Sequence, residues 1–269
     1  MTRPFDSDAT RMRAAAALAA ASRVCVLTGA GVSAESGVPT FRDALTGYWA
    51  QMRAEDMATP EGFRARPAVV QAWYRTRIAG LARVAPNDGH RALAALAARV
   101  PALTLVTQNV DDLHERAGST DVIHLHGRLS DARCVDCGAE ATLPPLDAAD
   151  AAPPPDAGIR CAICGGWIRP GVVWFGEALP DGAFEGALDA ATTADVLIVA
   201  GTSGQVYPAA GLVHAAQAGG AFVIEVNPAP AYDGVADAVL AGPSGAVLPT
   251  LVAALDAQGT PSVSGSARP

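Results

Sequence analysis

The sequence predicts an α/β protein with a parallel β-sheet and a smaller second lobe. Three observations lead to this class. Short apolar runs that suit strands buried on both faces alternate with longer segments that have helical spacing. Several of these runs end directly in a glycine turn or a polar group, as strands do when their carboxyl ends carry a binding site. Between residues 128 and 170 the alternation gives way to loops, prolines and cysteines.

The composition allows one large core, or a core with a small lobe. Half of the 269 residues are hydrophobic and few are aromatic, so Ala, Val and Leu must form most of the interior. The net charge of -8 repels phosphate backbones, so we expect no nucleic-acid partner. No apolar run reaches the roughly 18 residues that span a bilayer, so we expect no membrane partner. Asp6 and Asp8 argue against a transit peptide, and without a secretory signal we expect a cytoplasmic protein.

The first predicted strand, residues 24–27, follows an Ala-rich helix and leads into a glycine turn at residues 29–31. Residues with little or no side chain let the backbone turn tightly and bring N–H groups against a ligand. Ser33 and Glu35 are expected in the first turn of a short helix whose positive end would face an anion. The segment is therefore either a phosphate-binding turn or an ordinary turn, since its spacing differs from the usual G-x-G-x-x-G.

The next segments are predicted as a mostly helical excursion over residues 44–85 and a further helix that starts at Pro86 and Asn87. A second strand over residues 103–106 then runs into the polar group of residues 107–112. If the two strands are parallel neighbours, this polar group lies beside the glycine turn.

His126 is the candidate general base among the five histidines, because it lies at the end of a predicted strand, VIHLHG, next to a glycine. His124 alternates with it and is expected to point to the opposite face, so that both cannot enter one site. His124, His114, His90 and His214 are interpreted as ordinary core or surface residues.

Four of the five cysteines form two C-x-x-C pairs, Cys134 with Cys137 and Cys161 with Cys164. Each pair places two thiolates on one tight turn, and the intervening loop allows the pairs to converge on a tetrahedral zinc ion with no open position. Such a zinc would be structural. Two disulfides or a redox pair are the alternatives, and Cys25 is interpreted as a small core residue.

Beyond the cysteine-rich segment, the sheet pattern is expected to resume at GVVWFGE, residues 171–177. A strand with a second glycine turn follows in DVLIVAGTSGQVYPAAGLV, and another strand, AFVIEVNP, ends at Asn227. Two glycine turns at the edges of one crevice would suit a dinucleotide. A helix closes the fold, and the polar tail from Gln258 is expected to be disordered.

Tyr74 and Arg77 lie three residues apart on a predicted helix and therefore on one face. Arg77 either pairs with a surface carboxylate or, together with the phenol of Tyr74, binds a carboxylate of a ligand, for which a guanidinium suits better than an ammonium.

Taken together, GAGVSAESGVPTFRD, TQNVDDLHERAG, HLHG, the two C-x-x-C pairs, RPGVVWFGE, GTSGQVYPAA and EVNP resemble, in this order, the motifs of the sirtuins, the NAD-dependent protein lysine deacylases. The resemblance covers roughly residues 14–256. It implies a Rossmann-like parallel-sheet large domain with a small lobe made of a zinc ribbon and a helical insertion. NAD and the acyl-lysine of a protein substrate would meet between them.

The resemblance also implies roles for individual residues. His126 would be the general base, and Asn109 would act beside it in catalysis. The residues that would bind NAD are Gly29, Ala30, Gly31, Ser33, Glu35, Phe41, Arg42, Gln108, Asn109, Asp111, His126, Gly201, Thr202, Ser203, Asn227 and Ser244. The residues that would contact the acyl-lysine are Ala58, Tyr74, Arg77, Val173, Trp174, Phe175 and Gly176. One structural Zn²⁺ would be bound by Cys134, Cys137, Cys161 and Cys164.

Ala58, Tyr74 and Arg77 resemble the branch whose members remove succinyl and malonyl groups. Ala58 would leave room for a longer acyl chain, and Tyr74 and Arg77 would bind its terminal carboxylate. The implied reaction removes acyl groups, acetyl and also succinyl or malonyl, and yields nicotinamide, 2′-O-acyl-ADP-ribose and free lysine. A mono-ADP-ribosyltransferase and a non-catalytic NAD sensor are the alternatives. The sequence does not indicate an oligomeric state.

The resemblance divides the chain into four parts. Residues 1–44, 86–128 and 171–257 would form the NAD-binding domain, residues 45–85 the helical insertion, residues 129–170 the zinc module and residues 258–269 a disordered tail.

Overall fold

The computed structural model describes residues 8–39, 50, 52–147, 153–154 and 156–258. Phe41 and Arg42, which were predicted to bind NAD, lie outside the described residues, as do residues 259–269 of the tail. No helix in these ranges is long and apolar enough to cross a membrane.

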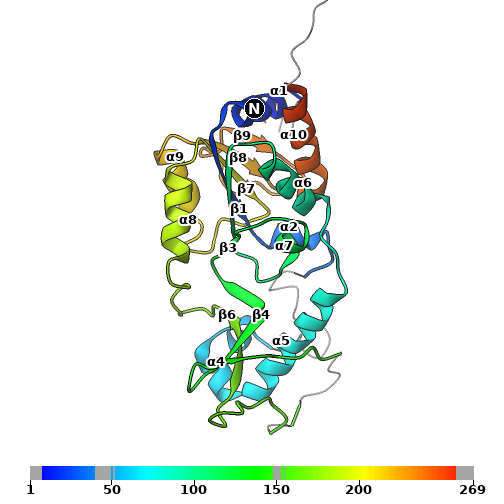
Figure 1. Cartoon of the computed structure of the whole chain (residues 1–269), viewed down its shortest axis with the longest axis vertical. Coiled ribbons are helices and arrows are strands. Elements are labelled where there is room, and N and C mark those ends of the chain that lie inside the picture. Colours follow the sequence, from blue (N-terminus) through cyan, green and yellow to red (C-terminus); the bar gives the residue numbers. More distant parts are fainter. Residues whose placement is uncertain (1–7, 40–49, 51, 148–152, 155, 259–269) are drawn as a thin grey trace, which may run out of the picture.

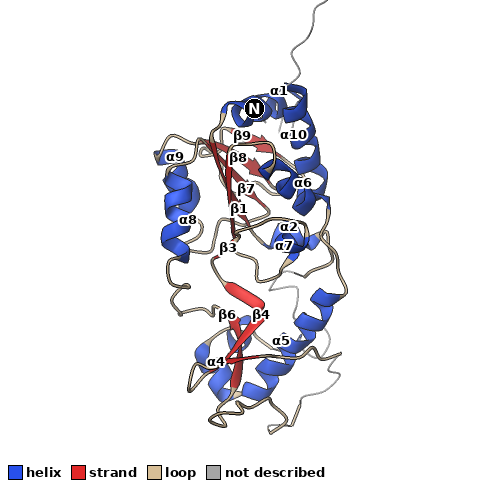
Figure 2. Cartoon of the chain, viewed as in Figure 1, coloured by secondary structure: helices blue, strands red, loops and turns tan. Residues whose placement is uncertain are grey.

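The larger sheet has six parallel strands in the order β3-β2-β1-β7-β8-β9 (Figures 1 and 2). Its strands are β1 (Arg23–Thr28), β2 (Ala102–Thr107), β3 (Ile123–His124), β7 (Val196–Ala200), β8 (Phe222–Val226) and β9 (Ala238–Leu240). The helices packed around it are α1 (Asp8–Ala20), α6 (Asp88–Ala97), α8 (Ala183–Thr192), α9 (Gly211–Ala218) and α10 (Ser244–Gln258), with the short α2 (Ala30–Ala34) and α7 (Leu113–Arg116) at strand ends. The predicted α/β class with a parallel sheet is confirmed.

Strand β1 shows why helices cover both faces of this sheet. Successive side chains of a strand point to opposite faces. Val24 and Val26 therefore enter the core beneath α1, α6 and α10, while Cys25 and Leu27 enter the core beneath α8 and α9. All four side chains are buried, which explains a continuous apolar run rather than an alternating one. Figure 2 shows the two helical layers on either side of the strands.

The smaller lobe joins a helical segment to a three-stranded sheet of order β5-β4-β6 (Figure 1). Its elements are α3 (Ala54–Met57), α4 (Pro60–Ala65), α5 (Pro67–Ala82), β4 (Gly127–Cys134), β5 (Glu140–Ala141) and β6 (Ile168–Val172). Trp73 and Tyr74 of α5 pack against Leu129 of β4 and Val172 of β6. One apolar core thus joins two segments that are far apart in the sequence.

Two expectations about elements are wrong. GVVWFGE does not resume the large sheet, because Gly171 and Val172 end β6 and pair with β4 in the small sheet. Helix α2 begins after Gly29 and ends before Glu35, so Glu35 lies at its C-terminal end rather than in its first turn. The helix starts early because Gly29 and Gly31 are held against the loop after β7.

The loops after β1 and β7 touch each other through their backbones. Gly29 N–H donates to the Ala200 carbonyl at 3.0 Å, and Gly31 N–H donates to the Gly201 carbonyl at 2.8 Å. A Cβ at Gly31 would lie 2.8 Å from Gly201 Cα, and Gly201 has a φ of 61°, where glycine is favoured. These glycines are therefore required for contact between the two loops, whether or not a ligand is bound.

We predict that Gly31→Ala lowers the free energy of unfolding by at least about 2 kcal/mol, because the new methyl group meets backbone atoms that cannot move aside. Urea denaturation measures the change. Gly80→Ala is the matched control, since that exposed position of α5 has open space around it. The control should gain about 0.5 to 1 kcal/mol from better helix propensity. Equal stability of the two variants would contradict the proposed contact.

Candidate active site

The candidate site lies at the carboxyl ends of β1, β2 and β7, where the strand order reverses. From β1 the chain proceeds to β2 and β3 on one side, and β7 to β9 lie on the other. Such a reversal leaves a crevice beyond the strand ends, which is where open α/β sheets bind ligands. The predicted NAD residues of the three loops, 29–33, 108–111 and 201–203, therefore converge as expected from parallel strands.

A directed chain of hydrogen bonds runs behind this crevice from Asn87 to Asp111. Asn87 N–H lies 3.3 Å from His90 Nδ1, so Nδ1 accepts and the proton of this neutral ring resides on Nε2, 3.3 Å from Ser33 Oγ. Asn109 Nδ2 donates to the same Ser33 oxygen at 3.1 Å. The Ser33 hydroxyl is then left to donate to the Asp111 carboxylate.

A second chain fixes the backbone of Asn109. His114 Nε2 lies 3.0 Å from Thr28 Oγ1, and Thr28 donates its hydroxyl to Thr107 Oγ1 at 2.8 Å. Thr107 Oγ1 in turn accepts the Asn109 N–H at 3.0 Å. Since Thr28 donates to Thr107, it must accept from His114 Nε2–H.

His126 is half-buried, and its Nδ1 lies 3.0 Å from the Gln108 carbonyl oxygen. A carbonyl only accepts, so Nδ1 carries the proton and Nε2 presents its lone pair, as a general base requires. Burial lowers the pKa of His126, and the hydrogen bond to Gln108 offsets part of this effect. The neutral, proton-accepting ring therefore dominates at neutral pH.

The expectation that His124 and His126 point to opposite faces assumed one continuous strand, and that assumption is wrong. Strand β3 ends at His124, and His126 lies in the turn before β4. The alternation of a strand therefore does not apply between them. Their Nδ1 atoms bond neighbouring carbonyls of one loop, Asn109 at 3.2 Å for His124 and Gln108 at 3.0 Å for His126.

Gln108, Thr202 and Asn227, all predicted to bind NAD, are joined by hydrogen bonds. Thr202 Oγ1 accepts from Gln108 Nε2 at 3.1 Å, and its carbonyl accepts from Asn227 Nδ2 at 2.7 Å. Ser203 is exposed beside it. Ser244 is buried, and its hydroxyl has no hydrogen-bond partner among the described residues. A buried unpaired hydroxyl is costly, so Ser244 fits a role in binding a polar ligand.

Glu35 lies near this cluster, on the loop that follows α2. Its Oε2 accepts the Gly245 N–H at 2.6 Å, at the start of α10. Acceptors are favourable at helix N-termini. Glu35 thus links the α2 loop to the residue next to Ser244, and its predicted contact with NAD stays a prediction.

The predicted acyl residues adjoin His126 through the loop 173–176, which has no regular structure in its described residues. Val173 N–H donates to the His126 carbonyl at 2.8 Å, and Phe175 N–H donates to the Ala58 carbonyl at 2.9 Å. Trp174 Nε1 donates to the Tyr74 hydroxyl at 3.0 Å. This loop therefore connects the predicted base to the small lobe, and its last two residues, Phe175 and Gly176, are exposed.

Tyr74 of α5 is buried in the apolar core of the small lobe, and Arg77 of the same helix is half-buried. Burial raises the pKa of Tyr74 to about 12, so the phenol keeps its proton. Burial lowers the pKa of Arg77, while the nearby Tyr74 and Asp111 raise it. Arg77 therefore lies within electrostatic reach of Tyr74, predicted to contact the acyl group, and of Asp111, predicted to bind NAD.

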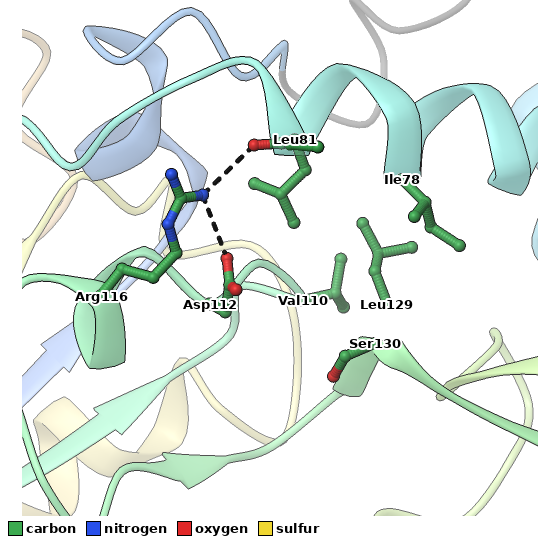
Figure 3. Close-up of a pocket in the computed structure, with 8 residues that line it drawn as sticks. Ile78, Leu81, Val110, Asp112, Arg116, Leu129 and Ser130 are labelled. Carbon is green, nitrogen blue, oxygen red and sulfur yellow. Dashed lines mark hydrogen bonds and ion pairs between the residues drawn. The ribbon is translucent and has the colours of Figure 1, made fainter. Parts of the chain in front are cut away.

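A separate pocket of about 170 Å³ lies between α5, the loop after β2, and β4 (Figure 3). It is lined by Ile78, Leu81, Ala82, Val110, Asp112, Arg116, Leu129 and Ser130. Arg116 donates to the Leu81 carbonyl at 3.2 Å and to Asp112 at 3.5 Å, as Figure 3 shows, and also bonds the Val84 carbonyl. Arg116 thus ties the end of α5 to the loop that carries Asn109.

The four predicted metal ligands converge at the far end of the small lobe. Their sulfur atoms all lie within 4.8 Å of one another, with 3.4 Å between Cys134 and Cys164 and 3.7 Å between Cys137 and Cys161. Tetrahedral Zn–S bonds of about 2.3 Å separate the sulfurs by about 3.8 Å. The cluster therefore fits one zinc ion. Cys25 lies apart in β1, where burial raises its pKa to about 12, as suits an inert core residue.

Sequence reasoning missed the role of two histidines, His90 and His114. Both are almost fully buried, and their rings pack 4.8 Å apart behind the crevice. The one local signal is that His90 follows the helix-capping Asn87 by three residues and closes a capping box. Nothing in the sequence around His114 indicates its contact with Thr28.

Three comparisons with known proteins agree with this geometry. The model of the Sir2 family matches residues 29–208. An NAD-dependent protein deacylase of Ralstonia nicotianae is 54% identical over 245 residues, which cover 90% of this chain and 95% of that protein. A Sir2 homolog in complex with NAD is 39% identical with a TM-score of 0.83, covering 96% of this chain and 97% of that one. Sir2Af2 bound to a myristoylated histone peptide is 30% identical with a TM-score of 0.74, covering 94% and 98%.

We predict that Cys161→Ser abolishes stoichiometric zinc binding and lowers the thermal midpoint, because the cluster then lacks one thiolate. Metal analysis of the purified chain and differential scanning calorimetry measure both effects. Cys25→Ala is the control and should keep one zinc per chain, since Cys25 lies outside the cluster. Full zinc content in Cys161→Ser would show that zinc is not bound by this cluster of four cysteines.

The buried histidines predict a loss of stability in acid. Burial lowers the pKa of His90 to about 4 and that of His114 to about 3. An unfolded chain binds protons on both below about pH 6.5, whereas the folded chain does not, so stability falls as the pH drops from about 6.5 towards 4. The contribution of His90 is about 3 kcal/mol at the lower end.

We therefore expect the unfolding free energy of His90→Gln to fall less steeply as the pH drops. The difference in slope should correspond to the uptake of about one proton on unfolding. Urea midpoints recorded across the pH range give the slope for each protein. His214→Gln, at an exposed position of α9, is the matched control and should leave the slope unchanged. An unaltered slope in His90→Gln would mean that this ring is not kept neutral by folding.

Proposed function

The chain belongs to the Sir2 family, and we infer that it is an NAD-dependent protein deacylase that prefers lysine acyl groups ending in a carboxylate, succinyl or malonyl. Deacylation follows from the family and from the named relatives. The acyl preference is the finer part of the inference. It depends on a single observation, the half-buried guanidinium of Arg77, which lies 4.9 Å from the centre of the Trp73 ring next to the buried phenol of Tyr74.

The carboxylate preference is supported by the surroundings of Tyr74. Its hydroxyl accepts from Trp174 Nε1, so the phenol proton is directed elsewhere and is available to a ligand oxygen. Ala58 is buried close by and contributes only a methyl group to the same cluster. A guanidinium and a phenol donor next to a small residue suit a longer acyl chain with an acidic end.

Bound NAD would supply an activated ribose with nicotinamide as the leaving group. The glycine loops after β1 and β7, with Ser244, would hold it. His126 would take a proton from a ribose hydroxyl at Nε2, since its Nδ1 proton is retained by the Gln108 carbonyl. Asn109, held through its side chain and its N–H, would present a fixed amide to the nicotinamide side.

The partners that this proposal implies are proteins with acylated lysines. A relative of this fold has been solved with an acylated histone peptide, which supports such a substrate. We also place the protein in the cytoplasm. The five cysteines are unpaired thiols and four of them form the metal cluster, which suits a reducing compartment.

Rates on acetyl, malonyl and succinyl lysine peptides test the proposal. Arg77→Met should lower kcat/KM on the succinyl peptide by about 10- to 100-fold, because a charge-assisted hydrogen bond contributes about 1.5 to 3 kcal/mol. Acetyl turnover should change little. Arg75→Met is the matched control on the same helix, where Arg75 instead donates to the Pro144 carbonyl.

Equal losses on the acetyl and succinyl peptides would rule out the carboxylate-binding role of Arg77. Mass spectrometry of the same reactions separates lost acyl groups from ADP-ribose transferred to protein. No nicotinamide release from NAD with any acylated peptide would overturn the deacylase assignment itself.

A further inference from the structure

His124 is buried directly behind the loop that carries Asn109, and no role has been assigned to it above. Only 8% of its surface is exposed. Its Nδ1 lies 3.2 Å from the Asn109 carbonyl oxygen, and its Nε2 lies 2.6 Å from Glu115 Oε1 of α7. Both ring nitrogens therefore have partners of defined chemistry.

Both partners are acceptors, and this decides the charge of the ring. A backbone carbonyl cannot donate. Glu115 cannot donate either when ionised. Burial acts to raise its pKa, but the hydrogen bond from His124, a backbone hydrogen bond and the nearby Arg128 hold that pKa below the ordinary value. A neutral imidazole has only one N–H and would leave one contact as two opposed lone pairs. His124 is therefore doubly protonated.

The charges around His124 come from three elements. Glu115 and the neutral His114 face it from α7, and Asp111 faces it from the loop after β2. Arg128 of β4 lies 3.7 Å from the same Glu115 oxygen. Glu115 is thus the direct charge partner of the ring, while Arg128 is exposed and burial raises the pKa of Asp111.

The contact completes the fixation of Asn109. Its side-chain amide is held by Ser33 and its N–H by Thr107, and His124 holds its carbonyl oxygen. The neighbouring carbonyl, that of Gln108, is held by His126. Two consecutive peptide groups at the end of β2 are thus oriented by two histidines from the HLHG segment.

We propose that His124, held as an imidazolium by Glu115, is a positioning residue that orients the Asn109 loop for nicotinamide release. The proposal rests on the proposed deacylase function for its kinetic part only. The charged state of the ring can be tested on the folded protein without turnover. A core histidine that only fills space would need neither the charge nor the carboxylate.

The charge is tested by nuclear magnetic resonance of the full chain with ¹⁵N-labelled histidine, assigned by His124→Gln. At neutral pH both ring nitrogens of His124 should give imidazolium signals, and Glu115→Gln should convert them to those of a neutral ring. Glu185→Gln, at an exposed position of α8, should leave them unchanged. A neutral ring in the wild-type protein would overturn the proposal.

The positioning role is tested by steady-state kinetics on one acylated peptide. His124→Gln should lower kcat by about 10- to 100-fold, since small displacements of the reacting geometry have effects of that size. The KM for the peptide should stay unchanged, because the peptide side of the site is not touched. His214→Gln is the matched control and should keep wild-type kcat.

Glu115→Gln adds a readout that a merely structural role would not move. Its kcat relative to wild type should be close to that of His124→Gln, with the KM for the peptide again unchanged, because the substitution removes the carboxylate that holds the ring. Wild-type kcat in Glu115→Gln or in His124→Gln would overturn the positioning role. An inactive wild-type protein would instead overturn the deacylase function, and the resonance experiment would still decide the charge.

Discussion

The backbone contact between the loops after β1 and β7 is the constraint on which the rest of the site depends. At this point the strand order reverses, and two loops from opposite halves of the sheet must share the space beyond the strand ends. They approach so closely that Gly31 donates directly to the Gly201 carbonyl. Side chains are excluded from the contact at Gly31, so backbone forms the floor at this point of the crevice. The N–H groups of Gly29 and Gly31 are already donated within the contact, which fixes the two loops against each other.

The hydrogen bonds between the polar groups behind this floor have a defined donor-to-acceptor direction. Each chain of hydrogen bonds includes a buried neutral histidine, His90 or His114, and each chain binds Asn109, one at its side-chain amide and the other at its N–H. In a low-dielectric interior such a network is costly if one member lacks a partner and rigid if every member has one. The arrangement therefore gives an orientation to Asn109 that a loop on the surface would not have. It also suits the neutral state of the His90 and His114 rings, whose pKa values burial lowers.

The small lobe contributes a second kind of rigidity. Its apolar core holds α5 against β4 and β6, and Arg116 ties the end of α5 to the loop after β2. Tyr74 and Arg77 therefore sit on a helix that is linked both to the small sheet and to the loop after β2. The zinc cluster lies at the distant end of the same lobe, where four thiolates can maintain the turns of a short sheet that has little core of its own.

The sequence alone determined the α/β class, most strands of the large sheet, the four metal ligands and the candidate base His126. These features follow from local periodicity and spacing, which report burial and turns over a few residues. The sheet assignment of Gly171 and the shared loop of His124 and His126 could not be derived in this way. Local pattern does not say which sheet a strand joins or where a strand of two residues ends. The tertiary structure also decided the partners of buried polar atoms. Ser33 meets His90 and Asn109 across 57 and 76 residues of chain, and only the crossing of strands brings such atoms within hydrogen-bond distance.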